Sequence, residues 1–138
     1  MAYWLMKSEP ATWSWQQQVD QGPEPWTGVR NHQAANNMKA MRLGDRAFFY
    51  HSGEERAIKG VVEIVKTYYP DPTDPTGRFG MVDVRAVMPV KAPVTLAMVK
   101  AEPRLKDFAL VRQSRLSVMP VSPAAWAILC KMAGIGPG

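Results

Sequence analysis

The sequence predicts an α+β fold in which a curved, mostly antiparallel sheet or small barrel carries helices at its edges. Three observations support this. Strand-like and helix-like segments are interspersed, their connections are short and turn-like, and the 138 residues are the length of one domain. Such a chain buries roughly 70% of its unfolded surface, so it folds without disulfides or metals. We expect residues 1–138 to form a single domain.

The first third of the chain contains one strand and two helices. Residues 3–7 (YWLMK) are predominantly apolar and precede Pro10, which predicts a strand. Ser14 and Gln17 have the spacing of a capping box, which predicts a helix that ends before the GPEP turn. A second helix is expected over about residues 31–42, ended by Leu-Gly.

A hairpin is predicted next. Residues 46–51 and 57–66 have strand character and are separated by the polar turn SGEER. The two-residue period places Phe49 and His51 on one face of the first strand. Gly60 leaves room for another group to approach the backbone closely.

The second half alternates in the same way. The proline-rich residues 70–78 are a loop. We expect the remaining elements to be a strand over 79–90, a short helix capped by Thr95, a strand over 115–121, and a final helix from Ser122–Pro123 to about Met132.

Composition limits the class of protein. The net charge is +5, with 17 Lys and Arg against 12 Asp and Glu, and this favours phosphate-bearing partners. The basic residues are scattered, so a solvated basic surface explains the charge equally well. A single cysteine suits a reducing compartment, and no signal peptide or membrane-spanning run is visible. We therefore expect a soluble, intracellular, cytoplasmic protein with no membrane partner.

Several kinds of site are not supported by any motif. The chain has only two histidines and one cysteine, without metal-ligand spacing, so no metal site is expected. It has no glycine-rich phosphate-binding motif, so no cofactor is expected. Cys130 shares an apolar helical stripe with Trp126 and Leu129, which predicts a core residue rather than a nucleophile.

The segment WTGVRN carries the most specific chemistry. Trp26 offers a flat stacking face, and Asn31 offers a hydrogen-bond donor and an acceptor, as recognition of a planar heterocycle requires. A tryptophan in such a loop is also often a core residue. Its polar neighbours, including Arg30, favour the wall of a ligand pocket.

Other polar residues stand at the ends of predicted strands. Lys7, Ser8 and Glu9 fit a ligand-binding strand end, a solvated turn, or an acid/base pair. By residue type alone, His51 is more often a hydrogen-bonded structural histidine than a catalyst. Arg115 can contact a phosphate, although alone it is an ordinary arginine.

Taken together, the blocks YWLMKSEP, W-x-GVRN-x-x-A-x-N, GD-x-x-FFYHS, GVVEIV, YPDPT, MVDV, PVTL and RLSVMPV resemble the EVE-domain family of the PUA-like superfamily. They occur in order from Tyr3 to about Ala133. The resemblance implies a PUA-like curved sheet or pseudo-barrel with surrounding helices, and a deep pocket for a modified nucleobase. EVE domains are similar to YTH readers of N6-methyladenosine.

The resemblance also implies roles for individual residues. Arg115 would meet a phosphate. The loop after YPDPT is shorter than in many members, and Phe79 lies near the place of a family tryptophan, so it is expected as a possible second aromatic wall. The residues expected to form the base pocket are Lys7, Ser8, Trp26, Arg30, Asn31, His51 and Ser52.

The leading hypothesis is a non-catalytic module that binds a methylated or hydroxymethylated base in DNA or RNA. A rival is a small amidohydrolase acting on a modified nucleoside, as in relatives of the ASCH group, with Lys7 and Glu9 as the acid/base pair. A third is a protein-interaction module whose pocket is vestigial. The expected partner in the first case is nucleic acid carrying a modified base.

Overall fold

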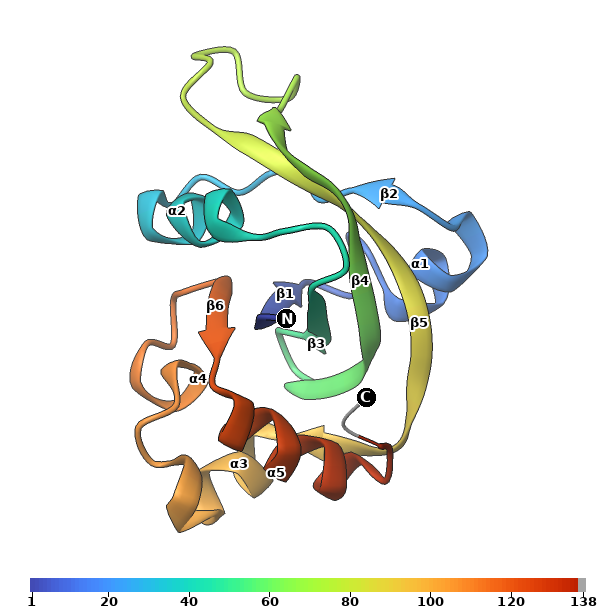
Figure 1. Cartoon of the computed structure of the whole chain (residues 1–138), viewed down its shortest axis with the longest axis vertical. Coiled ribbons are helices and arrows are strands. Elements are labelled where there is room, and N and C mark those ends of the chain that lie inside the picture. Colours follow the sequence, from blue (N-terminus) through green and yellow to red (C-terminus); the bar gives the residue numbers. More distant parts are fainter. Residues whose placement is uncertain (137–138) are drawn as a thin grey trace.

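A computed structural model describes residues 1–136 of the protein. Its six strands form one sheet in the order β2-β5-β4-β3-β1-β6, and every neighbouring pair is antiparallel except β1 and β3 (Figure 1). The long strands β4 and β5 bend strongly, which curves the sheet. The predicted α+β class and curved, mostly antiparallel sheet are confirmed. The strands are β1 (Tyr3–Ser8), β2 (Glu24–Pro25), β3 (Arg46–His51), β4 (Ala57–Pro70), β5 (Gly80–Thr95) and β6 (Val118–Val121).

Helices lie around the rim of this sheet rather than in a separate layer (Figure 1). In that view α3, α4 and α5 gather near one end of the molecule, and α1 lies beside β2. The helices are α1 (Trp15–Gln21), α2 (His32–Ala40), α3 (Leu96–Ala101), α4 (Ala109–Arg112) and α5 (Pro123–Ala133), with a 3-10 helix η1 (Pro103–Leu105).

The predicted helix starts are confirmed by hydrogen bonds at the caps. Ser14 forms a capping box with Gln17 at the start of α1, Thr95 caps α3, and the Ser122 hydroxyl accepts from the Ala125 amide at the start of α5. Such caps stabilise a helix by about 1 kcal/mol because they satisfy amides that have no partner within the helix.

Some element boundaries differ from the prediction. The second helix ends at Ala40, because Met41 is already extended. The predicted loop after the first helix contains the two-residue strand β2, and β5 continues to Thr95, five residues beyond the predicted end. The two strand differences arise from pairing between strands, since β2 is defined by its bonds to β5 and the end of β5 pairs with β4.

Strand β3 separates two aromatic clusters, as the two-residue period predicts. On one face Phe48 stacks on Trp126 of α5, with ring centroids 4.0 Å apart. On the other face Phe49 meets Trp15 and Trp26 edge to face, each at 5.4 Å. The second cluster supports the segments that form the site described below.

Two residues fulfil their predicted structural roles. A Cβ atom at Gly60 would lie 2.3 Å from the Trp15 ring, so the missing side chain is what lets the indole pack on β4. Cys130 is buried in α5, and burial raises the pKa of its thiol to about 11. A thiol with that pKa is not a reactive nucleophile at neutral pH.

Candidate functional site

A cleft opens between the end of β1, the segment before α1, and the segment from β2 to Gly28. Its volume is about 490 Å³, a size typical of small-ligand sites. We call it the tryptophan cleft. Its lining residues are Lys7, Ser8, Glu9, Thr12, Trp13, Glu24, Pro25, Trp26, Thr27 and Gly28.

The two indoles of this cleft are held by the surrounding fold. Trp26 is only 7% exposed because Phe49 packs against its ring, yet the indole still lines the cleft. Trp13 is partly buried, and its indole N–H donates to Gln18 Oε1 at 2.9 Å. The Ser8 hydroxyl donates to the Trp13 carbonyl at 2.5 Å. The cleft therefore has two fixed aromatic surfaces.

Polar side chains at this cleft are available to a ligand. Within residues 1–136, the side chains of Glu9, Thr12, Glu24 and Thr27 form none of the hydrogen bonds or ion pairs observed. Carboxylates are acceptors only, and they suit the exocyclic amino group of a base such as cytosine or adenine.

Lys7 and Ser8, both predicted site residues, are at the cleft. Lys7 Nζ donates to the Ser114 carbonyl at 3.0 Å, and burial lowers the pKa of its amine. In the described part of the chain, no ion pair joins Lys7 to Glu9, although both line the cleft. An acid/base pair is therefore not assembled in this conformation.

His51, one of the residues expected to form the base pocket, does not line the tryptophan cleft. Its Nε2 accepts from the Trp15 amide at 2.9 Å, and its Nδ1–H donates to Glu55 at 2.6 Å. These bonds require the neutral Nδ1–H tautomer and occupy both ring nitrogens. His51 fixes the start of α1, and Ser52 lines an adjoining cleft instead.

Asn31 also lies elsewhere, since it lines a different hollow from Trp26. Its Oδ1 caps α2 by accepting from the Ala34 amide at 2.9 Å. Asn31 and Arg115 together line a separate surface hollow, the Arg115 groove, with Gln33 and residues 112–114. The carboxamide is placed by helix capping, which a short motif does not distinguish from base recognition.

Arg30 supports the loop that carries Trp26 rather than lining the cleft. Its guanidinium pairs with the buried Asp71 at 3.2 Å, and Asp71 also accepts from the Gly28 amide at 2.9 Å. Burial raises the pKa of the Asp71 carboxyl, but hydrogen bonds from Thr73, Gly28 and Arg30 outweigh burial, so the net pKa is lowered. Asp71 thus anchors this loop as a carboxylate.

Phe79 packs on the His32 ring at 4.9 Å and does not line the tryptophan cleft. The second aromatic surface there is Trp13, and the shortened loop does not supply it. Trp13 was not among the residues predicted to form the pocket. One sequence signal could have indicated that Trp13 is held in a fixed position. It directly precedes Ser14, the N-cap of α1, and a hydrophobic residue at that position often fixes the angle at which the chain enters the helix.

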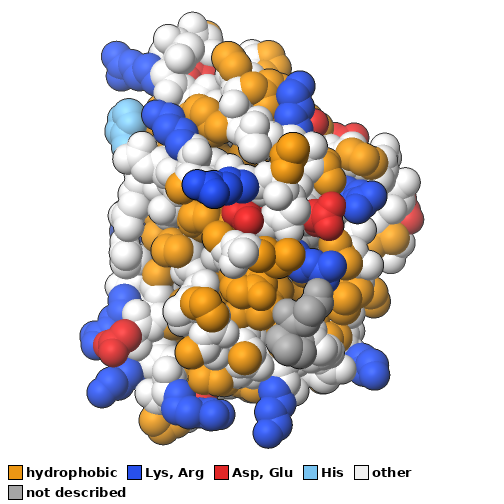
Figure 2. Space-filling model, viewed as in Figure 1, with side chains coloured by type: hydrophobic (Ala, Val, Ile, Leu, Met, Phe, Trp, Pro, Cys, Tyr) orange, Lys and Arg blue, Asp and Glu red, His pale blue; other side chains and the backbone are white. Residues whose placement is uncertain are grey.

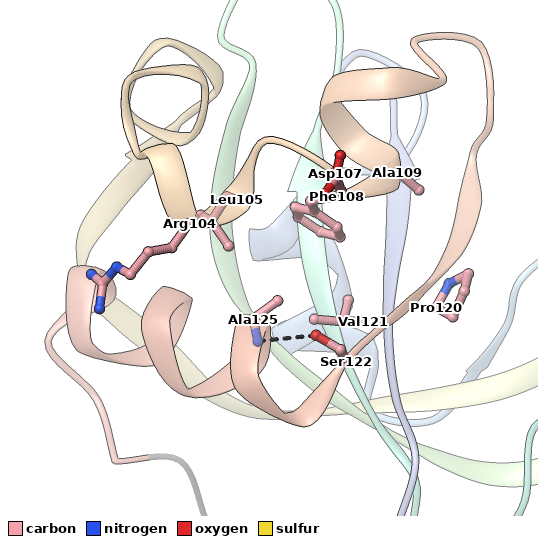
Figure 3. A pocket seen from close by; sticks show the side chains of 9 residues that line it. All are labelled: Arg104, Leu105, Asp107, Phe108, Ala109, Pro120, Val121, Ser122 and Ala125. Atoms are coloured by element: carbon pink, nitrogen blue, oxygen red, sulfur yellow. Dashed lines mark hydrogen bonds between the residues drawn. The ribbon is translucent and has the colours of Figure 1, made fainter.

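A second large hollow, the C-terminal cleft, lies between α4 and the start of α5 (Figure 3). Its volume is about 520 Å³. Its polar side chains already have partners: Arg104 pairs with Glu102, Asp107 with Arg112, and the Ser122 hydroxyl with the Ala125 amide. This cleft therefore offers a ligand fewer unpaired groups than the tryptophan cleft.

The surface charge agrees with the scatter seen in the sequence. On the face drawn in Figure 2, Lys and Arg side chains project at separate points around the molecule and form no single patch. In residues 1–136, no cluster of His, Cys, Asp and Glu suitable for a metal ion is found. None of the helices described is both long and apolar enough to span a bilayer.

Comparison with known proteins identifies the family. The family model described as the EVE domain matches residues 2–132. The chain belongs to the EVE-domain family. It is 36% identical to human thymocyte nuclear protein 1, with the alignment covering 88% of this chain and 69% of the human protein.

Solved structures agree with this assignment. Protein Rpa0253 of Rhodopseudomonas palustris is 60% identical with a TM-score of 0.91, covering 97% of this chain and 94% of that one. Human THYN1 in complex with DNA containing 5-methylcytosine is 33% identical with a TM-score of 0.87, covering 96% and 98%. A YTH domain of Zygosaccharomyces rouxii MRB1 shares the fold, at 16% identity and a TM-score of 0.59, covering 96% and 86%.

Proposed function

We propose that this EVE domain binds a modified nucleobase, with 5-methylcytosine in DNA as the first candidate, and does so without catalysis. The observation that carries the proposal is the tryptophan cleft, in which two fixed indoles stand beside unpaired carboxylates and hydroxyls. A flipped base would stack on Trp13 or Trp26. The relative solved with DNA containing 5-methylcytosine supports the choice of ligand.

The carboxylates suggest how the base would be read. Cytosine presents its N4 amino group as a donor, and Glu9 and Glu24 are the acceptors at the rim of the cleft. A methyl group at the neighbouring C5 position would add apolar contact with an indole. One added methyl is worth about 1 kcal/mol when fully buried, so we expect a several-fold preference for the modified base.

Titration of fluorescent single-stranded oligonucleotides, with and without one 5-methylcytosine, tests the proposal. Trp26→Ala and Trp13→Ala should each weaken binding of the modified strand by about tenfold, because a base–aromatic stack is worth about 1–3 kcal/mol. Phe79→Ala is the matched control, since this aromatic side chain lies outside the cleft. It should bind like the original protein.

Two outcomes would contradict the proposal. One is unchanged binding in both tryptophan variants while their circular dichroism and melting temperatures stay normal. The other is loss of binding in Phe79→Ala alone, which would restore that residue as the aromatic wall. Mass spectrometry of modified nucleosides incubated with the protein provides a separate check. Products that disappear in Lys7→Ala would favour the amidohydrolase over the binding module.

A further inference from the structure

We propose that a second cleft beside the tryptophan cleft binds a backbone phosphate of the strand that carries the modified base. This inference rests on the proposed function and makes its ligand a single-stranded segment rather than an isolated base. The second cleft, which we call the lysine cleft, has a volume of about 440 Å³. Its polar lining includes Lys7, Tyr50, Ser52, Arg56, Lys100 and Ser114.

The two clefts differ in charge. Lys7, Arg56 and Lys100 line the lysine cleft. In the part of the chain that the structure describes, none of its lining residues is acidic, and the Glu9 carboxylate lies beside Gly53 at its edge. In contrast, Glu9 and Glu24 line the tryptophan cleft. A phosphate is repelled by the carboxylates and attracted by the three cations, whereas a neutral base is suited to the indoles. The charges thus separate the two parts of one nucleotide chain.

The two clefts adjoin at Lys7. Lys7 lines both of them, and its ammonium group extends from β1 to the Ser114 carbonyl on the far side. Ser114 in turn lines the Arg115 groove, which contains Arg112 and Arg115. Arg56 also lines a further hollow, in which Glu54 and Glu55 supply carboxylates that would repel a phosphate. The strand is therefore expected to leave the lysine cleft towards Arg115.

One polar group that lines the lysine cleft forms no hydrogen bond within the described part of the protein. Tyr50 is 2% exposed and lines the lysine cleft, and among residues 1–136 its hydroxyl makes none of the hydrogen bonds observed. Burial raises the pKa of this phenol, although Arg56 opposes the shift, so it remains an O–H donor at neutral pH. A phosphate oxygen would satisfy this donor, and its charge would be balanced by the nearby cations.

The guanidinium of Arg56 uses one nitrogen for a hydrogen bond within the protein and can offer the others to a ligand. Its Nε donates to the Gly53 carbonyl at 3.0 Å, which leaves its terminal nitrogens for a ligand. Arg56 also has a positive φ of 49°, an unusual backbone conformation for a residue with a side chain. Such conformations cost about 1–3 kcal/mol and concentrate at functional sites. This strain is consistent with a residue held in place for binding.

Salt titration of binding to a short single-stranded DNA tests the lysine cleft. The slope of log affinity against log salt becomes shallower by about 0.7 for each phosphate of a single strand that the protein no longer neutralises. Lys100→Ala should reduce the slope by about 0.7, and Arg56→Ala with Lys100→Ala by about 1.4. Lys131→Ala removes the same charge from an exposed position near the end of α5 and should leave the slope unchanged.

Three ligands separate this inference from the proposed function: the strand with 5-methylcytosine, the same strand unmodified, and the free modified nucleoside. The reduced slope should appear with both strands, while nucleoside affinity stays unchanged. An unaltered slope, an equal reduction in Lys131→Ala, or a loss of nucleoside affinity would each overturn the phosphate role. Equal affinity for the two strands would instead overturn base recognition. Absence of strand binding at low salt would overturn both.

Discussion

The tryptophan cleft and the C-terminal cleft have similar volumes, about 490 and 520 Å³, but different chemistry. In the C-terminal cleft, Arg104, Asp107 and Ser122 are each bonded to a neighbouring group (Figure 3). In the tryptophan cleft, two indoles stand beside the carboxylates of Glu9 and Glu24, which form no hydrogen bond or ion pair observed within residues 1–136. Volume alone therefore does not identify a binding site. Flat stacking surfaces and unpaired polar groups are more informative, because they interact with a ligand instead of with the protein.

Replacing an aromatic residue of the C-terminal cleft should give the largest effect on stability. Phe108 is 8% exposed and belongs to the hydrophobic core. Phe108→Ala should lower the free energy of unfolding by about 3–5 kcal/mol, measured by urea denaturation, because it removes a buried ring and leaves a cavity. Binding of the folded fraction to the modified strand should be unchanged. Weakened binding per folded molecule would show that the two clefts are coupled.

Gly60→Ala should affect both stability and binding, because the new methyl group would collide with Trp15. We expect a loss of about 1–3 kcal/mol in urea denaturation, typical of overpacking. Displacement of Trp15 should also disturb the cluster around Phe49 that supports Trp26. Adding Trp15→Leu should restore part of the stability by making room. Full stability in Gly60→Ala would show that the indole moves without cost.

Acid should weaken the loops that carry Trp26 and Phe79. Hydrogen bonds, led by the Thr76 hydroxyl, lower the pKa of Asp74 to about 2, and the pKa of Asp71 is also lowered. A carboxyl with a depressed folded-state pKa contributes stability that is fully present above its unfolded value, near 3.9. That stability is lost as the pH falls through the folded value.

The free energy of unfolding should therefore decline between about pH 4 and pH 2, and less steeply in Asp71→Asn with Asp74→Asn. Urea denaturation at several pH values measures this decline. Equal slopes in the two proteins would indicate that other groups are responsible. At pH 7 the double variant should be the less stable protein, because Asn cannot replace the charged acceptors of the Gly28 and Phe79 amides.

The fold was largely predictable from the sequence because its signals are local. The capping residues Ser14 and Ser122 mark helix starts, and the alternation around Phe49 marks the faces of β3. The parallel pairing of β1 with β3 was not predicted, because it joins segments about 40 residues apart. The curved sheet was predicted from the interspersed elements and short connections, and the resemblance to the family implied the same curvature.

The candidate site was less predictable. Lys7, Ser8 and Trp26 line one cleft, whereas the side chains of Asn31, Arg30 and His51 form hydrogen bonds within the fold. Residue type cannot separate these uses, because a carboxamide caps a helix as readily as it binds a base. Which of them a side chain adopts depends on contacts between distant segments, such as the bond from the Trp15 amide to His51.

The bond from the Ser8 hydroxyl to the Trp13 carbonyl has a consequence for kinetics. It links the wall of the tryptophan cleft directly to β1, and Trp13 is also tied to Gln18 of α1. A wall fastened to a strand and a helix loses little conformational freedom when a ligand arrives. Association should then proceed in a single step, with backbone displacements of about 1 Å or less between the free and occupied protein.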